Sequence, residues 1–122
     1  MAKTDTQLIS EFSTSFAGGT YGKANRVFNI CKAADMIDGT AIAPGQEFDM
    51  NAAIGDRNKD NGWKTAAAIK EGAYVQEYGG GVCQVSTTLY NAVLMADLEV
   101  TERSHHSWPL GYVDIGRDAT IS

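Results

Sequence analysis

The chain has 122 residues, of which 43% are hydrophobic, and its formal net charge is −5. This length and composition are typical of one globular domain with a modest core, so residues 1–122 are interpreted as a single domain. The acidic balance and the lack of a Lys/Arg-rich block argue against nucleic acid as a partner. No apolar stretch approaches the roughly 20 residues of a membrane-spanning helix, so we expect no membrane contact by the domain itself.

The first part of the chain predicts a strand followed by a helix. Residues 8–16 alternate partly and contain β-branched and aromatic types, which is typical of a strand. Apolar residues between positions 27 and 37 recur at helical spacing, and Asp38-Gly39 supplies a stop. This spacing places Cys31 on the packed face and Asn29 on the solvated face. Because Cys31 is expected to be packed, we do not expect a disulfide with Cys83.

The remainder of the chain predicts short strands around a second helix. Strands are expected at residues 47–51, 72–78, 98–103 and 110–115, and residues 65–69 fit either a strand or a short helix. The second helix is expected from about Gln84 to Ala96, because apolar residues from Val85 onward recur every three or four positions. Two helices among five or six short strands predict an α+β domain with a mainly antiparallel sheet.

The run Gly79-Gly80-Gly81-Val82-Cys83 leads directly into the second predicted helix. Cys83 should therefore lie at or near a helix N-terminus, where N–H groups and the helix dipole stabilise a thiolate and lower the pKa of the thiol. The N–H groups of Gly80, Gly81 and Val82 are candidates for binding an oxyanion. The alternative is that Cys83 is a small buried residue and the glycines form only a tight turn.

The two histidines of the chain, His105 and His106, are neighbours about twenty residues after Cys83. A cysteine with a histidine and a carboxylate elsewhere in the sequence is typical of a cysteine nucleophile and its base. On an extended backbone neighbouring side chains point to opposite faces, so only one of the two histidines can face Cys83. We expect no metal site, since no HExxH or CxxC spacing is present, and no cofactor.

These motifs resemble the VanW domain family, and the resemblance covers nearly the whole chain. Its most specific part is residues 79–90, and it continues through Glu102-Arg103, His106-Ser107-Trp108-Pro109 and residues 116–120. The chain departs from the family at residues 48–51, where Phe-Asp-Met-Asn replaces the usual Phe-Ser-Phe-Asn. It also departs at His105, where the family usually has another residue, and this favours His106 as the functional histidine. Members commonly extend further, so a C-terminal strand is expected to be truncated here.

Proteins of this family act at the bacterial cell wall, and some are peptidoglycan L,D-transpeptidases. The resemblance therefore implies an extracytoplasmic, cell-wall-facing enzyme with peptidoglycan stem peptides as its partners; a membrane anchor in the full-length protein stays open. Cys83 would form a thioester with a stem peptide, and His106 would serve as general acid and base. If water accepts the acyl group, the enzyme is a carboxypeptidase. The alternatives are a papain-like cell-wall endopeptidase of the NlpC type and a non-catalytic wall-binding module in which Cys83 is structural.

Further residues are candidates for supporting roles. Asp118 either orients His106 or forms an ion pair with an arginine. Arg103 and Arg117 are candidates for holding a substrate carboxylate by a bidentate contact. The remaining candidates for substrate binding are Gln84, Ser107 and Trp108.

Overall fold

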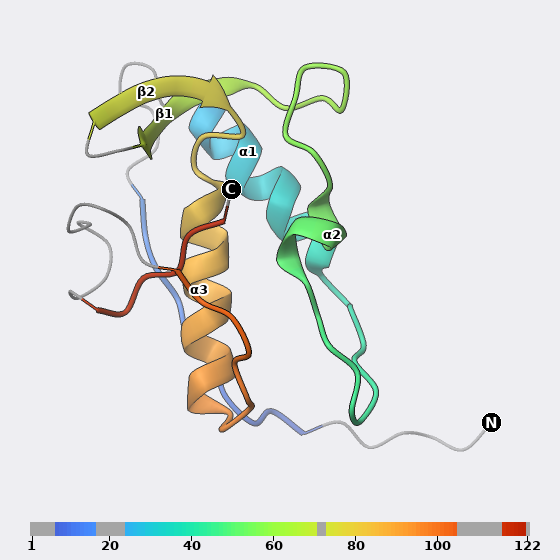
Figure 1. Cartoon of the computed structure of the whole chain (residues 1–122). Helices are drawn as coiled ribbons and strands as arrows, with labels where there is room; N and C mark the ends of the chain where they lie inside the picture. The colour runs from blue at the N-terminus through green and yellow to red at the C-terminus, as the bar shows by residue number, and fades with distance from the viewer. Residues whose placement is uncertain (1–6, 17–23, 71–72, 105–115, 122) are drawn as a thin grey trace.

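The computed structural model describes residues 7–16, 24–70, 73–104 and 116–121 (Figure 1). The elements in chain order are α1 (Ala24–Ile37), α2 (Met50–Ile54), β1 (Thr65–Lys70), β2 (Ala73–Tyr78) and α3 (Val82–Met95). Helix α3 runs through the centre of the domain, and the β1–β2 hairpin lies beyond its N-terminal end (Figure 1). Helices α1 and α2 lie to one side of α3, and α1 also contacts β1.

The core lies where the three helices meet. Ile30 and Ala33 of α1 pack with apolar residues of α2 and of the first turns of α3. Trp63, in the loop before β1, is only 3% exposed and belongs to the same cluster. The full set of buried residues in this cluster is Ile30, Ala33, Met50, Ile54, Trp63, Val82 and Val85. The start of α3, where Cys83 lies, is therefore held by the best-packed part of the domain.

The predicted five- or six-stranded sheet is wrong, although the domain is α+β. The described residues contain one two-stranded antiparallel sheet, with pairs from Thr65↔Tyr78 to Lys70↔Ala73. The only other pairing among them is an isolated antiparallel bridge between Ser104 and Thr120. Residues 98–103 form no strand. Residues 110–115, another predicted strand, lie outside the described residues.

Two other predicted strands take different forms for identifiable reasons. Residues 47–51 do not pair with a neighbour, because Asp49 caps helix α2 and accepts a hydrogen bond from the Asn51 N–H at 2.9 Å. Residues 8–16 form no ladder, and their side chains bond to α3 instead. The Ser10 hydroxyl donates to the Ala92 carbonyl at 2.6 Å, and the Thr14 and Thr88 hydroxyls are 2.8 Å apart.

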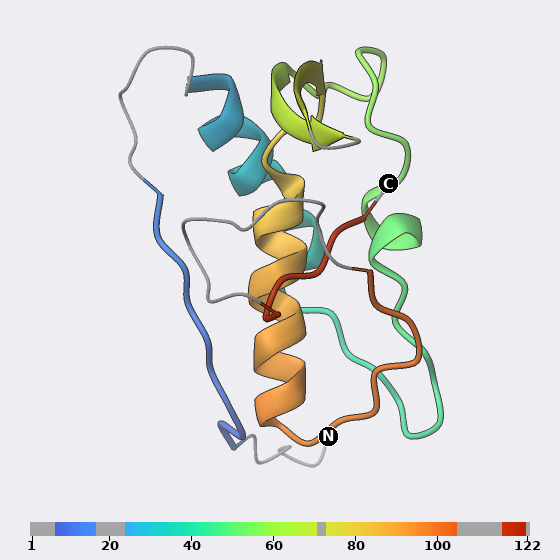
Figure 2. The ribbon, with the colours of Figure 1, turned by 60° about the vertical axis from the view of Figure 1, so that its left-hand side comes forward.

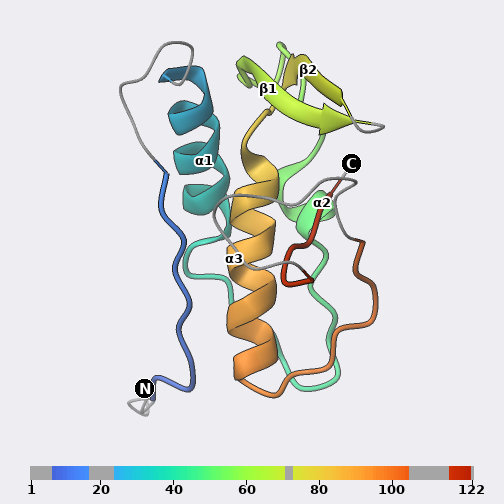
Figure 3. The ribbon, with the colours of Figure 1, turned by 90° about the vertical axis from the view of Figure 1, so that its left-hand side faces the viewer.

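Two extended segments run along different sides of α3 (Figures 2 and 3). Residues 7–16 follow one side and residues 116–121 follow another. Helix α3 offers these segments polar side chains that are buried, namely Gln84, Ser86, Thr87 and Asn91. A buried polar side chain is stable only when it is hydrogen-bonded, and the two segments supply the partners. The two segments thus satisfy the buried polar side chains of α3 without a larger sheet.

The buried face of α1 also differs from the sequence prediction. Asn29, expected on the solvated face, is fully buried, whereas Cys31, expected in the core, is exposed. The physical reason is that Asn29 bonds backbone groups next to the hairpin and in the glycine turn, at Lys64 and Gly80. Its side chain accepts from the Lys64 N–H at 3.0 Å and donates to the Lys64 carbonyl at 2.8 Å. Three such bonds, counting the one to Gly80, outweigh the apolar preference of the opposite face.

Candidate functional site

The glycine run forms a tight turn between β2 and α3, and residues of β1 and α1 pack closely against it. Gly79 and Gly81 have positive φ angles of 84° and 103°, which favour glycine. Gly80 has an ordinary φ, but a Cβ atom there would lie 2.5 Å from the Ala66 carbonyl oxygen of β1. A Cβ on Gly81 would lie 2.8 Å from Cγ of Arg26 in α1. The glycines therefore let two neighbouring elements approach the residues that lead to Cys83.

The N–H groups of the turn differ in whether the protein already uses them. The Gly80 N–H donates to the Glu77 carbonyl at 3.3 Å, and the Val82 N–H donates to the Gly79 carbonyl at 3.1 Å. The Gly81 N–H has no partner in the part of the chain that the structure describes. Of the three predicted oxyanion donors, Gly81 is thus the one whose N–H forms no backbone bond to another described residue. The oxyanion role itself stays a prediction.

Cys83 is the second residue of α3, as the sequence predicts, and its side chain is partly exposed. Its sulfur lies 3.1 Å from the Thr120 hydroxyl. The Ile121 N–H donates to the sulfur at 3.5 Å, and the Ile121 carbonyl lies at the same distance. Cys83 and Cys31 form no disulfide. The sulfur therefore faces hydrogen-bonding groups of residues 116–121, the C-terminal segment, as well as the positive end of the helix dipole.

The C-terminal segment is fixed to α3 by side-chain hydrogen bonds. The Ala119 N–H donates to the Thr87 hydroxyl at 2.9 Å, and the Ala119 carbonyl accepts from Ser86 at 2.6 Å and from Thr87 at 3.0 Å. One turn further on, the Asn91 amide donates to the Arg117 carbonyl at 2.7 Å. These hydrogen bonds of Ser86, Thr87 and Asn91, called the seam below, position the segment along the helix. They bring the residue after Ala119, Thr120, to Cys83.

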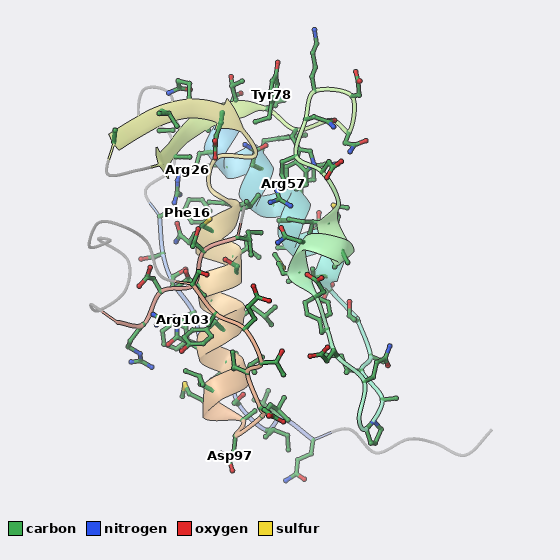
Figure 4. The ribbon with its side chains drawn as sticks, in the orientation of Figure 1. Phe16, Arg26, Arg57, Tyr78, Asp97 and Arg103 are labelled. Atoms are coloured by element: carbon green, nitrogen blue, oxygen red, sulfur yellow. The ribbon has the colours of Figure 1, made fainter. Side chains whose placement is uncertain are left out.

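The structure contains the ion pair that the sequence allowed for Asp118. Its carboxylate lies 3.6 Å from Nη2 of Arg103, and Nε of Arg103 donates to the Asp118 carbonyl at 2.8 Å. Arg103, which is labelled in Figure 4, also lies over the ring of Tyr90 on α3. Arg117 donates to the Asn91 side chain at 3.0 Å and lies over the ring of Phe12. Both arginines thus take part in packing the C-terminal segment, and their roles toward substrate stay predictions.

Gln84, a predicted substrate contact, is only 2% exposed. Its amide donates to the Thr14 hydroxyl at 3.0 Å and to the Ser15 carbonyl at 3.2 Å, and its carbonyl oxygen accepts from Arg26. Figure 4 shows Arg26 and Phe16 near the start of α3, where this network joins α1 to residues 7–16. Gln84 therefore connects three parts of the fold next to Cys83.

Other predicted site residues, His106, Ser107 and Trp108, lie outside the described residues, as does His105. Sequence reasoning missed Thr120 as a neighbour of Cys83, and it missed the seam of Ser86, Thr87 and Asn91. The signal available for the seam was the cluster of small polar side chains at helical spacing inside an otherwise apolar helix. Within the described ranges, no three His, Cys, Asp or Glu side chains gather as metal ligands.

A family model described as "VanW like protein" matches residues 25–122. The chain belongs to the VanW family. The match includes every described residue of the site, from the glycine turn to Thr120. No solved structure matches the chain significantly. None of the helices in the described part of this VanW domain is long and apolar enough to cross a membrane.

Two curated relatives are similar to this VanW domain. It is 38% identical over 125 residues to the uncharacterized protein YoaR of Bacillus subtilis (strain 168), covering 98% of this chain and 41% of YoaR. It is 34% identical over 103 residues to the vancomycin B-type resistance protein VanW of Enterococcus faecalis (strain ATCC 700802 / V583), covering 80% of this chain and 38% of that protein. The chain thus spans about two fifths of the length of these relatives.

Proposed function

We propose that this VanW domain is a cysteine-dependent acyltransferase of the bacterial cell wall, specifically a peptidoglycan L,D-transpeptidase. The observation that carries the proposal is the placement of Cys83 in the first turn of α3, partly exposed, with hydrogen-bond donors directed at its sulfur. First-turn N–H groups, the helix dipole and these donors all favour a thiolate. The Enterococcus faecalis relative is named a vancomycin resistance protein, which agrees with a role at the cell wall.

The proposed reaction has two steps. The Cys83 thiolate attacks the carbonyl carbon of the third residue of a stem tetrapeptide, so that an S–C bond forms and the C–N bond to the terminal D-Ala breaks. The leaving amine takes a proton from His106. The amine of a second stem then attacks the thioester, gives its proton to His106 and releases Cys83. The N–H groups of Gly81 and Cys83 are the proposed donors to the oxyanion.

The placement of Ser104 supports His106 as the partner of Cys83. Ser104 pairs with Thr120, whose hydroxyl lies 3.1 Å from the Cys83 sulfur. Because His106 follows Ser104 by two residues, the Cα atoms of the two are within about 7 Å of each other by covalent geometry. The bridge at Ser104 therefore brings the chain two residues before His106 next to the segment that contacts the Cys83 sulfur.

The proposed setting is the outer face of the cell, with peptidoglycan stem peptides as substrates. The test uses the purified domain, a defined stem tetrapeptide as donor and a second stem as acceptor, followed by muropeptide analysis. We expect cross-linked dimers with wild type, none with Cys83→Ala, and wild-type yield with Cys31→Ala, because Cys31 is exposed on α1.

The products distinguish the proposal from its alternatives. Shortened tripeptide stems without dimers would show a carboxypeptidase, and cleavage inside the stem would show an endopeptidase. Binding of peptidoglycan without any product, unchanged in Cys83→Ala, would show a wall-binding module and overturn the acyltransferase.

A further inference from the structure

We propose that Thr120 is a positioning residue for Cys83, and that its hydroxyl holds the sulfur of the nucleophile and donates a hydrogen bond to it. This inference deepens the proposed function and rests on it for the meaning of Cys83 as a nucleophile. The relevant contact is the 3.1 Å separation between Thr120 Oγ1 and Cys83 Sγ.

Thr120 is held in place from several directions. The residue before it, Ala119, is bonded through both its N–H and its carbonyl to side chains of α3. The N–H of Thr120 itself donates to the Ser104 carbonyl at 2.8 Å. The residue after it, Ile121, directs its N–H at the same sulfur. A hydroxyl fixed on such a backbone needs little further ordering to bond the sulfur, so the contact costs little entropy.

The hydrogen-bonding groups around the sulfur suit both protonation states. As a thiol, Cys83 is able to donate to the Ile121 carbonyl at 3.5 Å or to the Thr120 oxygen. As a thiolate, it accepts from the Thr120 hydroxyl and from the Ile121 N–H. A hydroxyl both donates and accepts, so Thr120 keeps its bond in either state, and the donated bond is stronger when the acceptor is charged. Loss of the hydroxyl therefore disfavours the thiolate.

The contact is also consistent with a purely structural role for Thr120, as one more bond that pins the C-terminal segment to α3. The two roles differ in what happens to the reactivity of the sulfur. A structural bond affects unfolding and leaves the pH dependence of Cys83 unchanged, whereas a positioning bond changes that pH dependence even when the fold is intact.

The test measures the alkylation rate of Cys83 by iodoacetamide against pH in four proteins: wild type, Thr120→Val, Thr120→Ser and Thr101→Val. Mass spectrometry follows Cys83 and Cys31 in the same sample, and the exposed Cys31 serves as internal reference. We expect Thr120→Val to lower the Cys83 rate at pH 7 by roughly threefold to tenfold and to raise the midpoint of its pH profile. Thr120→Ser, which keeps the hydroxyl, should restore the wild-type profile. Thr101 is exposed and should have no effect.

An unchanged or faster Cys83 rate in Thr120→Val, with circular dichroism and melting that match a folded protein, would overturn the positioning role. If Thr120→Val does not fold, Thr120→Asn is compared with Thr120→Ser instead. The asparagine side chain forms hydrogen bonds but has a different reach, so a positioning role requires that it shift the pH profile of Cys83 alkylation, and an unchanged profile would overturn that role. This assay is independent of transpeptidation. If the Thr120 variants leave the alkylation profile of Cys83 unchanged while cross-linking still depends on Cys83, the inference alone is rejected. If Cys83→Ala leaves cross-linking unaffected, the proposed function is rejected.

Discussion

The side chain of Asn29, fully buried in α1, donates a hydrogen bond to the carbonyl of Gly80, three residues before Cys83, at 3.0 Å. The same side chain bonds both backbone groups of Lys64, at the entry to β1. One amide thus connects α1, the hairpin and the turn that leads to the proposed nucleophile. The position of Cys83 is therefore set by a polar contact in the core as well as by the helix that begins there.

We expect Asn29→Leu to lower the free energy of unfolding by about 2–4 kcal/mol, because the Lys64 N–H and the Gly80 carbonyl lose the bonds that Asn29 makes to them. Asn25→Leu is the matched control on the same helix, since its single bond to the Thr65 carbonyl is exposed. That variant should lose no more than about 1 kcal/mol. Urea unfolding of both proteins checks the difference, and equal losses would contradict the role assigned to Asn29.

Gly80 gives a second test, because steric crowding and not φ requires glycine there. In Gly80→Ala the new Cβ would meet the Ala66 carbonyl oxygen at 2.5 Å and the carbonyl carbon at 2.6 Å, and backbone atoms have little room to move. We expect a loss of about 1–3 kcal/mol together with a changed Cys83 alkylation rate, since the turn must shift. Thermal unfolding and alkylation of the same samples measure both effects.

The control for Gly80 is Gly39→Ala, at the end of α1. Gly39 has a φ of 77°, but nothing lies within 4 Å of a Cβ built there. The Gly39→Ala protein should lose about 1–2 kcal/mol of its free energy of unfolding through backbone strain alone, and its Cys83 alkylation rate should be unchanged. A Gly80→Ala protein whose Cys83 reacts at the wild-type rate would show that the turn and the thiol are not coupled.

The seam between α3 and the C-terminal segment should be sensitive to loss of one hydroxyl. Thr87 is fully buried and exchanges two hydrogen bonds with the backbone of Ala119. Thr87→Val has nearly the same shape, so its expected cost of about 1–3 kcal/mol reflects the unsatisfied Ala119 N–H. The exposed Thr101→Val is the control and should change stability by less than about 0.5 kcal/mol. Equal midpoints of urea unfolding for Thr87→Val and Thr101→Val would mean that the seam contributes nothing to stability.

The sequence predicted the parts of this fold that local chemistry determines. The glycine run, the helix that follows it and the place of Cys83 at its start were predicted correctly, since the helical spacing of apolar residues and the turn residues agree there. The family was also identified correctly from these residues. Both features depend on residues that are close together in the chain.

The parts that the sequence predicted wrongly depend on distant partners. The alternation in residues 8–16 is typical of a strand, yet Ser10 and Thr14 bond to a helix and not to another strand. Asn29 seemed solvated because its apolar neighbours are on the other face of α1, but backbone groups at Lys64 and Gly80 need it. Thr120 was missed for the same reason, since its contact with Cys83 joins residues 37 positions apart. Periodicity reports which face is apolar and does not report which buried backbone groups lack partners.

The sharpest prediction concerns His105 and His106. His106→Ala should lower cross-linking far more than His105→Ala, by roughly 10²–10⁴-fold, the usual worth of general acid–base catalysis. The reason is the sequence expectation that neighbouring side chains on an extended backbone point in opposite directions, together with the family resemblance, which favours His106. Initial rates of dimer formation by the two variants, at equal protein and stem-peptide concentrations, measure the difference.

The pH profile of Cys83 alkylation tests the same pairing without substrate. In wild type its midpoint should lie below the free-thiol value of about 8.5, and in His106→Ala it should move upward, because the thiolate has lost its imidazolium partner. The sign follows from charge: a nearby cation favours the thiolate, so removing it means that a higher pH is needed to form the reactive species. The Ser104–Thr120 bridge, which brings the chain just before the histidines to the Cys83 sulfur, makes this coupling geometrically reasonable. A larger effect of His105→Ala, or a midpoint that stays in place in His106→Ala, would mean that Cys83 uses a different base.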